Sequence, residues 1–169
     1  MRKTCLILAC LALTTVLSGA AGCDTPPASP SNLNLIFKYG VGARNELNTF
    51  NGTYTRDMVM DPPITVNLSL SEEELDRIYD KMLEIDFFDY PEEFSVSTSG
   101  GSFGIMTPYS SYYFKVEYDS GIKELRWKDE ISYPDEKADK LRELIQLIRD
   151  VIEAKEEYKS LPEPTGGYL

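Results

Sequence analysis

Residues able to carry out catalysis are few in this 169-residue chain. It contains no histidine, and its three cysteines, Cys5, Cys10 and Cys23, all lie among the first 23 residues. Without histidine there is no Ser-His-Asp or Cys-His catalytic site and no histidine-ligated metal. Aspartate, glutamate, tyrosine, lysine and serine remain available. This inventory favours binding over enzymatic turnover, and no cofactor is expected.

Acidic side chains cluster in the segment DFFDYPEEF, which contains Asp86, Asp89, Glu92 and Glu93. A calcium loop alternates its oxygen ligands around a glycine, as in D-x-D-x-D-G, and that spacing is absent here. The cluster therefore predicts a solvated helix exit rather than a metal site. A carboxylate pair for glycoside cleavage stays open as an alternative, although no spacing singles one out.

The glycine-containing stretch SGGSFG, at 99–104, does not match a phosphate-binding loop. Such a loop needs G-x-x-x-x-G-K-[ST] at the start of a helix, and here neither the lysine nor a helical pattern follows. The surrounding segment, 95–111, is small and polar. It predicts a long mobile loop or one or two weak strands.

The stretch PYSSYY, at 108–113, is the best candidate for a binding surface. Tyrosine and serine dominate adaptable recognition surfaces, because tyrosine offers a large contact area at low entropic cost. Tyr109, Tyr112 and Tyr113 are therefore the candidate binding residues. The alternative is the start of a strand with half-buried tyrosines.

The N-terminus has the pattern of an export signal. Arg2 and Lys3 precede an apolar run from Leu6 to Leu17, and small residues follow at 18–22. The run is shorter than the ~20 apolar residues that span a bilayer core. It therefore predicts a secretory signal peptide over residues 1–22.

AAGC, from Ala20 to Cys23, resembles a bacterial lipobox. The resemblance covers residues 1–23 only. It implies that the Cys23 thiol carries diacylglycerol and that cleavage occurs just before it, which places the protein on the extracytoplasmic face of the cell membrane. The usual lipobox has leucine where this chain has Ala20, so ordinary signal peptidase cleavage at the same boundary is the alternative. Lipid attachment would account for a single unpaired thiol in an exported chain.

Charge limits the choice of partners. Removing residues 1–22 takes away two of the 17 basic residues and none of the 28 acidic ones, leaving a net charge of −13. Such a surface repels nucleic acid and anionic lipid headgroups. The expected partners are the membrane, through the anchor, and an envelope protein or a small ligand.

Hydrophobic periodicity places the elements of the fold. Strands are expected at 33–39, 49–60, 64–70, 112–118 and 122–128, with a loop at 40–48, a break at 61–63 and a turn at 119–121. Ser71 and Glu74 form a capping box that begins one helix. A second helix is expected from Asp135 to Tyr158, with a continuous apolar stripe.

The order β-β-β-α-β-β-α predicts an α+β fold, in which an antiparallel sheet of about five to six strands carries two helices on one face. The expected organisation is a lipidated Cys23 with a Pro/Ser-rich tether over 23–32, one domain over 33–162 and a disordered tail over 163–169. The favoured function is a membrane-anchored binding module. A carboxylate-dependent hydrolase of envelope polymers and a structural spacer are the alternatives.

Overall fold

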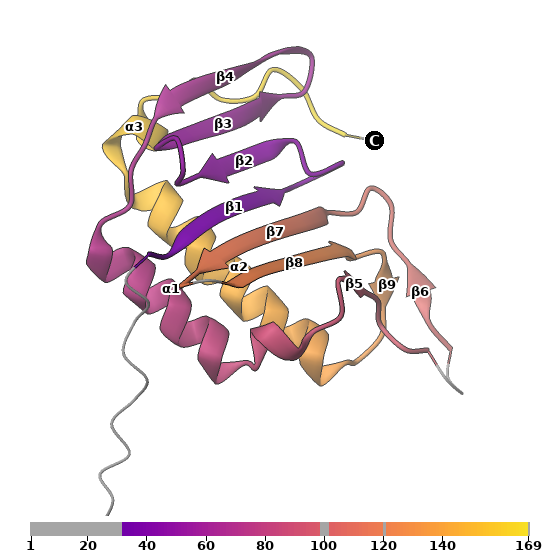
Figure 1. The fold of residues 1–169 in the computed structure, drawn as a ribbon. Coiled ribbons are helices and arrows are strands. Elements are labelled where there is room, and N and C mark those ends of the chain that lie inside the picture. Colours follow the sequence, from indigo (N-terminus) through magenta and orange to yellow (C-terminus); the bar gives the residue numbers. More distant parts are fainter. Residues whose placement is uncertain (1–31, 99–101, 120, 169) are drawn as a thin grey trace, which may run out of the picture.

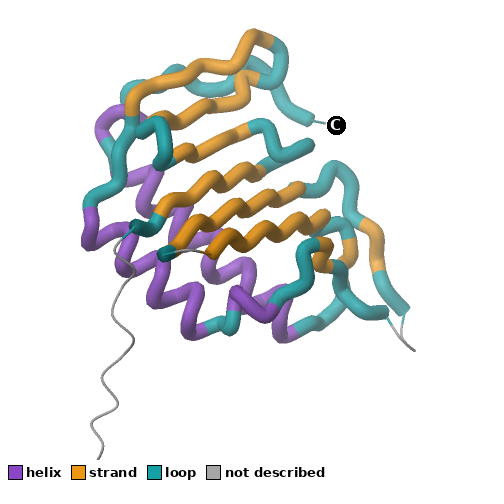
Figure 2. Tube along the Cα trace, viewed as in Figure 1, coloured by secondary structure: helices purple, strands orange, loops and turns teal. Residues whose placement is uncertain are grey.

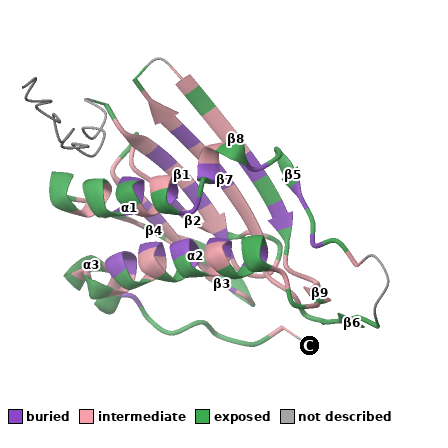
Figure 3. Cartoon of the chain, turned by 90° about the horizontal axis from the view of Figure 1, so that it is seen from below, coloured by how far each residue is buried: buried purple, intermediate pink, exposed green. Residues whose placement is uncertain are grey.

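The computed structural model describes residues 32–98, 102–119 and 121–168, which form a seven-stranded sheet with two long helices on one face (Figures 1 and 3). In chain order the elements are β1 (Asn34–Tyr39), β2 (Asn45–Asn48), β3 (Thr53–Met58), β4 (Asp61–Asn67), α1 (Glu72–Glu84), a 3-10 turn (Phe87–Asp89), β5 (Glu93–Phe94), β6 (Gly104–Ile105), β7 (Ser111–Tyr118), β8 (Gly121–Lys128), β9 (Ile131–Ser132), α2 (Glu136–Ala154) and α3 (Glu156–Lys159). The strand order is β4-β3-β2-β1-β7-β8-β5, and β6 and β9 form a separate ribbon. Among the strands of the described residues, only β5 and β8 pair in parallel. The α+β class is confirmed, with a mostly antiparallel sheet.

The main sheet has more strands than the five to six predicted. Asn45–Asn48 lies in the segment expected to be a loop, yet it pairs with both β1 and β3 as β2. The expected break at 61–63 is also wrong, because β4 begins at Asp61 and includes Pro62 and Pro63. β4 is an edge strand. Proline is tolerated there, because its missing N–H is not needed for a second neighbour.

The first helix begins as its sequence predicts. The Ser71 hydroxyl accepts the Glu74 amide proton over 3.2 Å, and the Glu74 carboxylate accepts the Ser71 amide proton over 2.7 Å. This reciprocal pair satisfies two otherwise unpaired backbone donors. The buried side of α1 is formed by Ile78, Tyr79 and Met82.

The C-terminal helix is shorter than the predicted span of Asp135 to Tyr158. Asp135 caps its start through Ala138, but α2 ends at Ala154, and Lys155 is extended with φ −72° and ψ 141°. The Lys155 ammonium binds the Glu74 carboxylate on α1 over 2.5 Å. After this break, α3 brings the Tyr158 ring to 5.4 Å from the ring of Tyr54 on β3. The break therefore turns the chain across the sheet.

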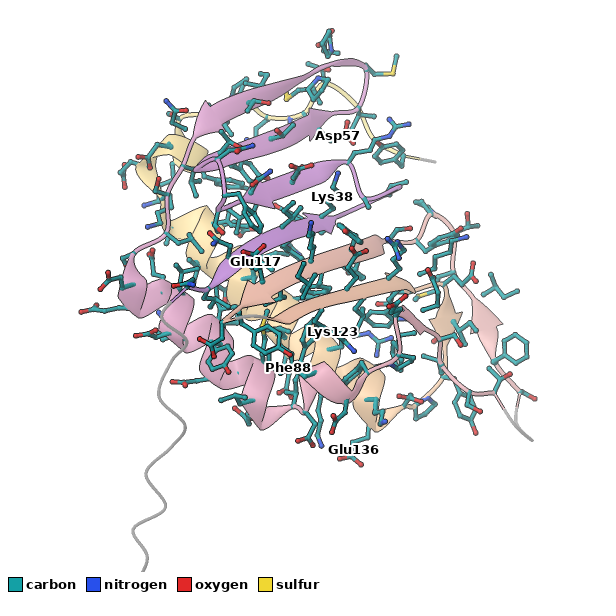
Figure 4. All side chains as sticks on the ribbon, viewed as in Figure 1. Lys38, Asp57, Phe88, Glu117, Lys123 and Glu136 are labelled. Atoms are coloured by element: carbon teal, nitrogen blue, oxygen red, sulfur yellow. The ribbon has the colours of Figure 1, made fainter. Side chains whose placement is uncertain are left out.

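The apolar core lies between the helices and the sheet face that they cover. Phe114 is fully buried at its centre, with ring centroids 4.8 Å from Phe37 and 5.3 Å from Phe87. Within DFFDYPEEF, Phe87 and Tyr90 are buried, whereas all four acidic residues are exposed, as the solvated-exit prediction requires. Beside this segment, the Lys123 ammonium donates to the Phe88 carbonyl over 2.9 Å and also to the Tyr90 carbonyl (Figure 4).

Toward the ends of β1 and β3 the core becomes polar. The hydroxyls of Tyr39 and Tyr54 form a buried hydrogen bond of 2.7 Å. Arg56, also on the helix-facing side of β3, is only 6% exposed. Its guanidinium donates to the carbonyls of Leu161 and Pro162 over 3.3 and 3.0 Å, so its buried charge is satisfied by backbone from the C-terminal segment.

Buried tyrosines are expected to make the folded state less stable at alkaline pH. Burial raises the pKa of Tyr39 and of Tyr54, and burial together with nearby Asp135 and Asp86 raises the pKa of Tyr90 to about 12. Because these hydroxyls stay neutral in the folded chain while unfolded tyrosines ionise near pH 10, the stability is complete below pH 10 and is lost above it. We expect the free energy of unfolding to fall by up to about 1.4 kcal/mol per pH unit for each such tyrosine.

Urea unfolding between about pH 8 and pH 11 measures this slope. Tyr39→Phe is expected to make it shallower, because it removes one of the hydroxyls whose pKa burial raises. Equal slopes for the wild type and Tyr39→Phe would contradict the assignment to this hydroxyl.

The C-terminal segment departs from the disordered tail expected over 163–169. Thr165 donates both its amide and its hydroxyl proton to the Met58 carbonyl, over 3.1 and 3.0 Å. Tyr168 donates to the Asp57 carboxylate and accepts a hydrogen bond of 3.1 Å from Arg44. Residues 162–168 therefore lie along the end of β3, where Asp57 is visible (Figure 4).

Candidate functional site

The loop between β1 and β2 lies at one end of the sheet. This end, which we call the loop end, also holds the turn before β7, the connection from β8 to β9 and the C-terminal segment (Figure 2). Gly40 has φ +88°, and a Cβ there would lie 2.8 Å from the Asn45 side-chain amide. That amide donates to the Tyr39 carbonyl over 3.3 Å, so a side chain at Gly40 would disrupt the turn.

One concave site at the loop end has mostly apolar walls. We call it the Trp127 groove, and its volume is about 480 Å³. Its lining comes from four segments of the chain: Ala43; Glu93, Phe94, Ser95 and Val96; Ser111, Tyr112 and Tyr113; and Arg126, Trp127, Lys128, Glu130 and Ile131. A volume of this size accommodates one large side chain or a small organic molecule.

Three aromatic rings in contact form the inner wall of the Trp127 groove, with Phe94 edge-on to Trp127 and Tyr112 tilted against it. The Trp127 ring centroid lies 5.5 Å from that of Phe94 and 5.4 Å from that of Tyr112. The Arg142 guanidinium lies 5.2 Å from the Trp127 ring and is held by both oxygens of Asp129, at 2.6 and 3.1 Å. These contacts fix the indole before any ligand arrives, which lowers the entropic cost of binding.

Trp127 has an unused hydrogen-bond donor. It is 2% exposed, and its Nε1 has no partner among the described residues. A buried donor left unpaired costs about 1–3 kcal/mol. The Nε1 atom is itself buried, so a ligand in the groove does not reach it in this structure.

The rim of the Trp127 groove is charged. Arg126 lies 5.0 Å from the Tyr113 ring, at 2.8 Å from Glu124 and at 3.6 Å from Glu93. Burial and the neighbouring Glu124 raise the pKa of Tyr113, so this hydroxyl is neutral at ordinary pH. The rim thus presents paired charges around an apolar interior.

An exposed apolar ribbon adjoins the groove. In the β6–β9 ribbon, Ile105 pairs with Ile131, which lines the groove. Ile105 is 72% exposed, and Phe103 and Met106 are 49% and 42% exposed. Grouped apolar exposure of this kind marks interaction surfaces, unlike single apolar residues scattered over a surface.

The structure divides the three predicted binding tyrosines between two concave sites. Tyr112 and Tyr113 both line the Trp127 groove. They reach it from opposite faces of β7, because Tyr112 lies on the helix-facing side with Phe114, and successive side chains alternate. Tyr109 is half-exposed and lines a neighbouring pocket of about 370 Å³, together with Pro108 and Tyr168.

Several groove residues were not singled out from the sequence. The position of Trp127 was predictable from the sequence, because the register of the β7–β8 hairpin places it directly opposite Tyr112. The positions of Phe94 and Val96 were not predictable, because β5 pairs with β8 in parallel across a long sequence separation. Ala43 comes from the β1–β2 loop, whose position depends on the whole sheet.

Cys23 and the signal segment lie outside the described residues, as do Ser99, Gly100 and Gly101 of the glycine-containing stretch. Within 32–98, 102–119 and 121–168, no helix is both long and apolar enough to cross a membrane. The same residues contain no group of three or more acidic, cysteine or histidine side chains that could hold a metal ion.

No family model matches this sequence, and no curated protein is found to be similar to it.

Proposed function

We propose that this chain is a lipid-anchored extracytoplasmic binding protein whose Trp127 groove holds an apolar or aromatic side chain from an extended segment of an envelope protein. The observation that carries this proposal is the preorganised aromatic wall that Trp127 forms with Phe94 and Tyr112. A peptide supplies the apolar side chain that fits against this wall. The apolar ribbon beside the groove extends the contact beyond what a small molecule needs.

The position of the groove agrees with an anchor at Cys23. The described chain enters at Asn32, just before β1 (Figure 1), and the groove lies toward the other end of β1, where its lining residue Tyr113 pairs with Lys38. β1 has six residues and separates the two ends by about 20 Å. A tether over 23–32 adds about 25–30 Å if it is extended at ~3 Å per residue. The groove would then face away from the lipid surface.

The groove favours binding over hydrolysis. Its two carboxylates, Glu93 and Glu130, lie among mainly apolar and aromatic side chains. The Glu93 side chain is 76% exposed and is paired with Arg126, so it is well solvated and not placed as a general acid. The hydrolase and spacer alternatives remain as outcomes of the experiment below.

Photo-cross-linking in the native membrane tests the proposal. A photoreactive amino acid at Ser95, an exposed groove residue, is expected to capture a recurrent protein, and mass spectrometry should map the cross-link to an apolar or aromatic segment. The same amino acid at Thr65, on exposed β4, is the control. Ile131→Glu places a charge in the groove wall and should lower the cross-link yield about tenfold or more.

Ile122→Glu is the matched control variant, because Ile122 is 62% exposed and does not line the groove. Its cross-link yield should equal that of the wild type. Equal yields from Ser95 and Thr65, or an unaltered yield in Ile131→Glu, would rule out the groove as the contact. Release of cleaved envelope polymer by the purified domain would instead favour the hydrolase alternative.

A further inference from the structure

The turn between β2 and β3 contains the only Asn-Gly pair in the sequence, Asn51 and Gly52. Residues 49–52 connect Asn48 to its cross-strand partner Thr53. Asparagine and glycine are common in tight turns, and Gly52 has φ +62°, a conformation that other side chains rarely adopt. The pair also brings an amide side chain next to a backbone nitrogen that no neighbouring side chain of its own residue shields.

Asparagine is a thermolabile residue, and in this position it can lose ammonia without an enzyme. The Gly52 backbone nitrogen loses its proton to hydroxide and attacks Asn51 Cγ, so that a new C–N bond forms while the bond from Cγ to Nδ2 breaks. The departing nitrogen takes a proton from water and leaves as ammonia. Water then opens the resulting succinimide ring at either carbonyl, which gives aspartate or isoaspartate. Water and hydroxide are the only co-reactants.

Neither reacting group forms a hydrogen bond within the described part of the chain. Asn51 is exposed, and its side-chain amide has no partner among residues 32–98, 102–119 and 121–168. The Gly52 N–H likewise has no partner within these residues, although the Gly52 carbonyl accepts a hydrogen bond of 2.8 Å from Leu68. Attack therefore does not first require either group to break a hydrogen bond.

The tip of the turn makes few contacts. At its start, Thr49 is fixed to β1 by hydrogen bonds of 2.7 and 3.0 Å. Beyond it, Phe50 is 41% exposed, and the Asn51 backbone amide donates to Asn48 Oδ1 over 3.3 Å. Exposed backbone with few buried contacts opens at a low cost in free energy. The Asn51 side chain can therefore rotate toward the Gly52 nitrogen while the sheet stays folded.

Asn67, at the end of β4, provides a comparison within the same chain. It is also exposed, but the next residue is Leu68, whose side chain hinders attack by its own backbone nitrogen. The Leu68 N–H is moreover bound to the Gly52 carbonyl, and the leucine is only 1% exposed. Exposure alone therefore does not predict the reaction at Asn67.

We propose that Asn51 is a site of spontaneous deamidation in the folded protein, which gives both aspartate and isoaspartate. The modification adds a negative charge to a chain that is acidic throughout its life. Isoaspartate also lengthens the backbone of the turn, because the chain then runs through the former side chain. Since the Gly52 carbonyl binds the Leu68 amide, the lengthened turn loosens the end of β4. This site is independent of the anchor and of the Trp127 groove.

Peptide mapping by mass spectrometry tests the proposal on the purified full-length mature protein, incubated at mildly alkaline pH in water enriched in a heavy oxygen isotope. Asn51 is expected to gain a solvent oxygen and to give two products, aspartate and isoaspartate, which chromatography separates. Asn67 should stay unchanged over the same period. The reaction at Asn51 should accelerate as the pH rises, because attack requires the deprotonated nitrogen. No reaction at Asn51 in the folded chain, where the urea-unfolded chain does react, or equal rates at Asn51 and Asn67, would overturn the proposal.

Two variants separate attack by Gly52 from direct hydrolysis of the amide. Asn51→Gln should lose the reaction, because its side chain must close a larger ring, and Gly52→Ala should slow it severalfold, because the added methyl group shields the nitrogen. Asn67→Gln is the matched control and should leave the rate at Asn51 unchanged. Aspartate as the sole product, or an unaltered rate in both Asn51→Gln and Gly52→Ala, would contradict the mechanism.

Hydrogen exchange measures the structural consequence in the same aged samples. The Leu68 amide is expected to exchange faster in the isoaspartate form than in the unmodified chain, because its acceptor is the Gly52 carbonyl. The amide of Val116, on the central strand β7, should exchange equally slowly in both forms. An unchanged exchange rate at Leu68 would contradict the loosening of β4.

Discussion

Replacing Arg56 by alanine is expected to lower the free energy of unfolding by about 2–4 kcal/mol. Arg56 is 6% exposed, although it is charged. Its guanidinium lies 4.1 Å from the Tyr158 ring and donates to the carbonyls of Leu161 and Pro162. Alanine removes both charge-assisted hydrogen bonds and the cation–π contact, and leaves a gap beside Tyr158. Water that enters to solvate the freed carbonyls offsets part of the loss.

Urea denaturation of Arg56→Ala against the wild type measures this effect. Arg126→Ala is the matched control, because Arg126 is exposed and forms surface ion pairs, which are worth about 0–1 kcal/mol. A chain ending at Leu161 tests the mechanism, since it lacks Pro162 and the hydrogen bonds of Thr165 and Tyr168. In that background Arg56→Ala should cost less. The same cost in both backgrounds would show that Arg56 acts without the tail.

Local signals identified most of the fold, because their physical causes lie within a few residues. The capping box at Ser71 and Glu74 requires only the spacing of two side chains. Strict alternation over 112–118 fixes which side of β7 is buried, since one face of the sheet is covered by helices. The covered face of α2 follows in the same way from its apolar stripe.

Elements stabilised mainly by their neighbours were not predictable. β2 has the sequence NELN and buries only Leu47, so it carries no alternating signal of its own. It is a strand because β1 and β3 satisfy its backbone on both sides. β5 is still shorter, and its parallel pairing with β8 sets one wall of the Trp127 groove.

The structure of the C-terminal segment was also not predictable from its local sequence. Composition over 163–169 is typical of a disordered tail, because it has few apolar residues to bury. The hydrogen bonds from Arg56 to Leu161 and Pro162 span more than 100 residues of sequence, as do those from Thr165 to Met58. An arginine on the buried face of β3 thus has a partner that no local pattern identifies. This segment also forms part of the wall of a pocket of about 430 Å³ beside Tyr39 and Tyr54.

Cys23→Ser is expected to abolish lipid attachment completely. No cysteine follows Cys23, so no other thiol of the mature chain can carry diacylglycerol. Labelling with a radioactive fatty acid, together with the intact N-terminal mass, measures the loss. Cys10→Ser is the matched control, because Cys10 lies in the segment removed by cleavage and its replacement should leave the label intact. A wild-type protein that begins at an unmodified Cys23 would instead establish ordinary secretion.

The same variant separates anchoring from recognition. In the proposed anchored form, two acyl chains pass the threshold for stable membrane attachment, so the anchor would raise the local concentration of the groove near its proposed partner without contacting either. Because the groove and the point where the chain enters lie at opposite ends of β1, loss of the lipid should not change the groove itself. We expect Cys23→Ser to lower the cross-link yield from Ser95 in cells, whereas the purified variant binds the captured segment with the affinity of the wild type. A lowered affinity in solution would mean that the lipid or the tether forms part of the binding site.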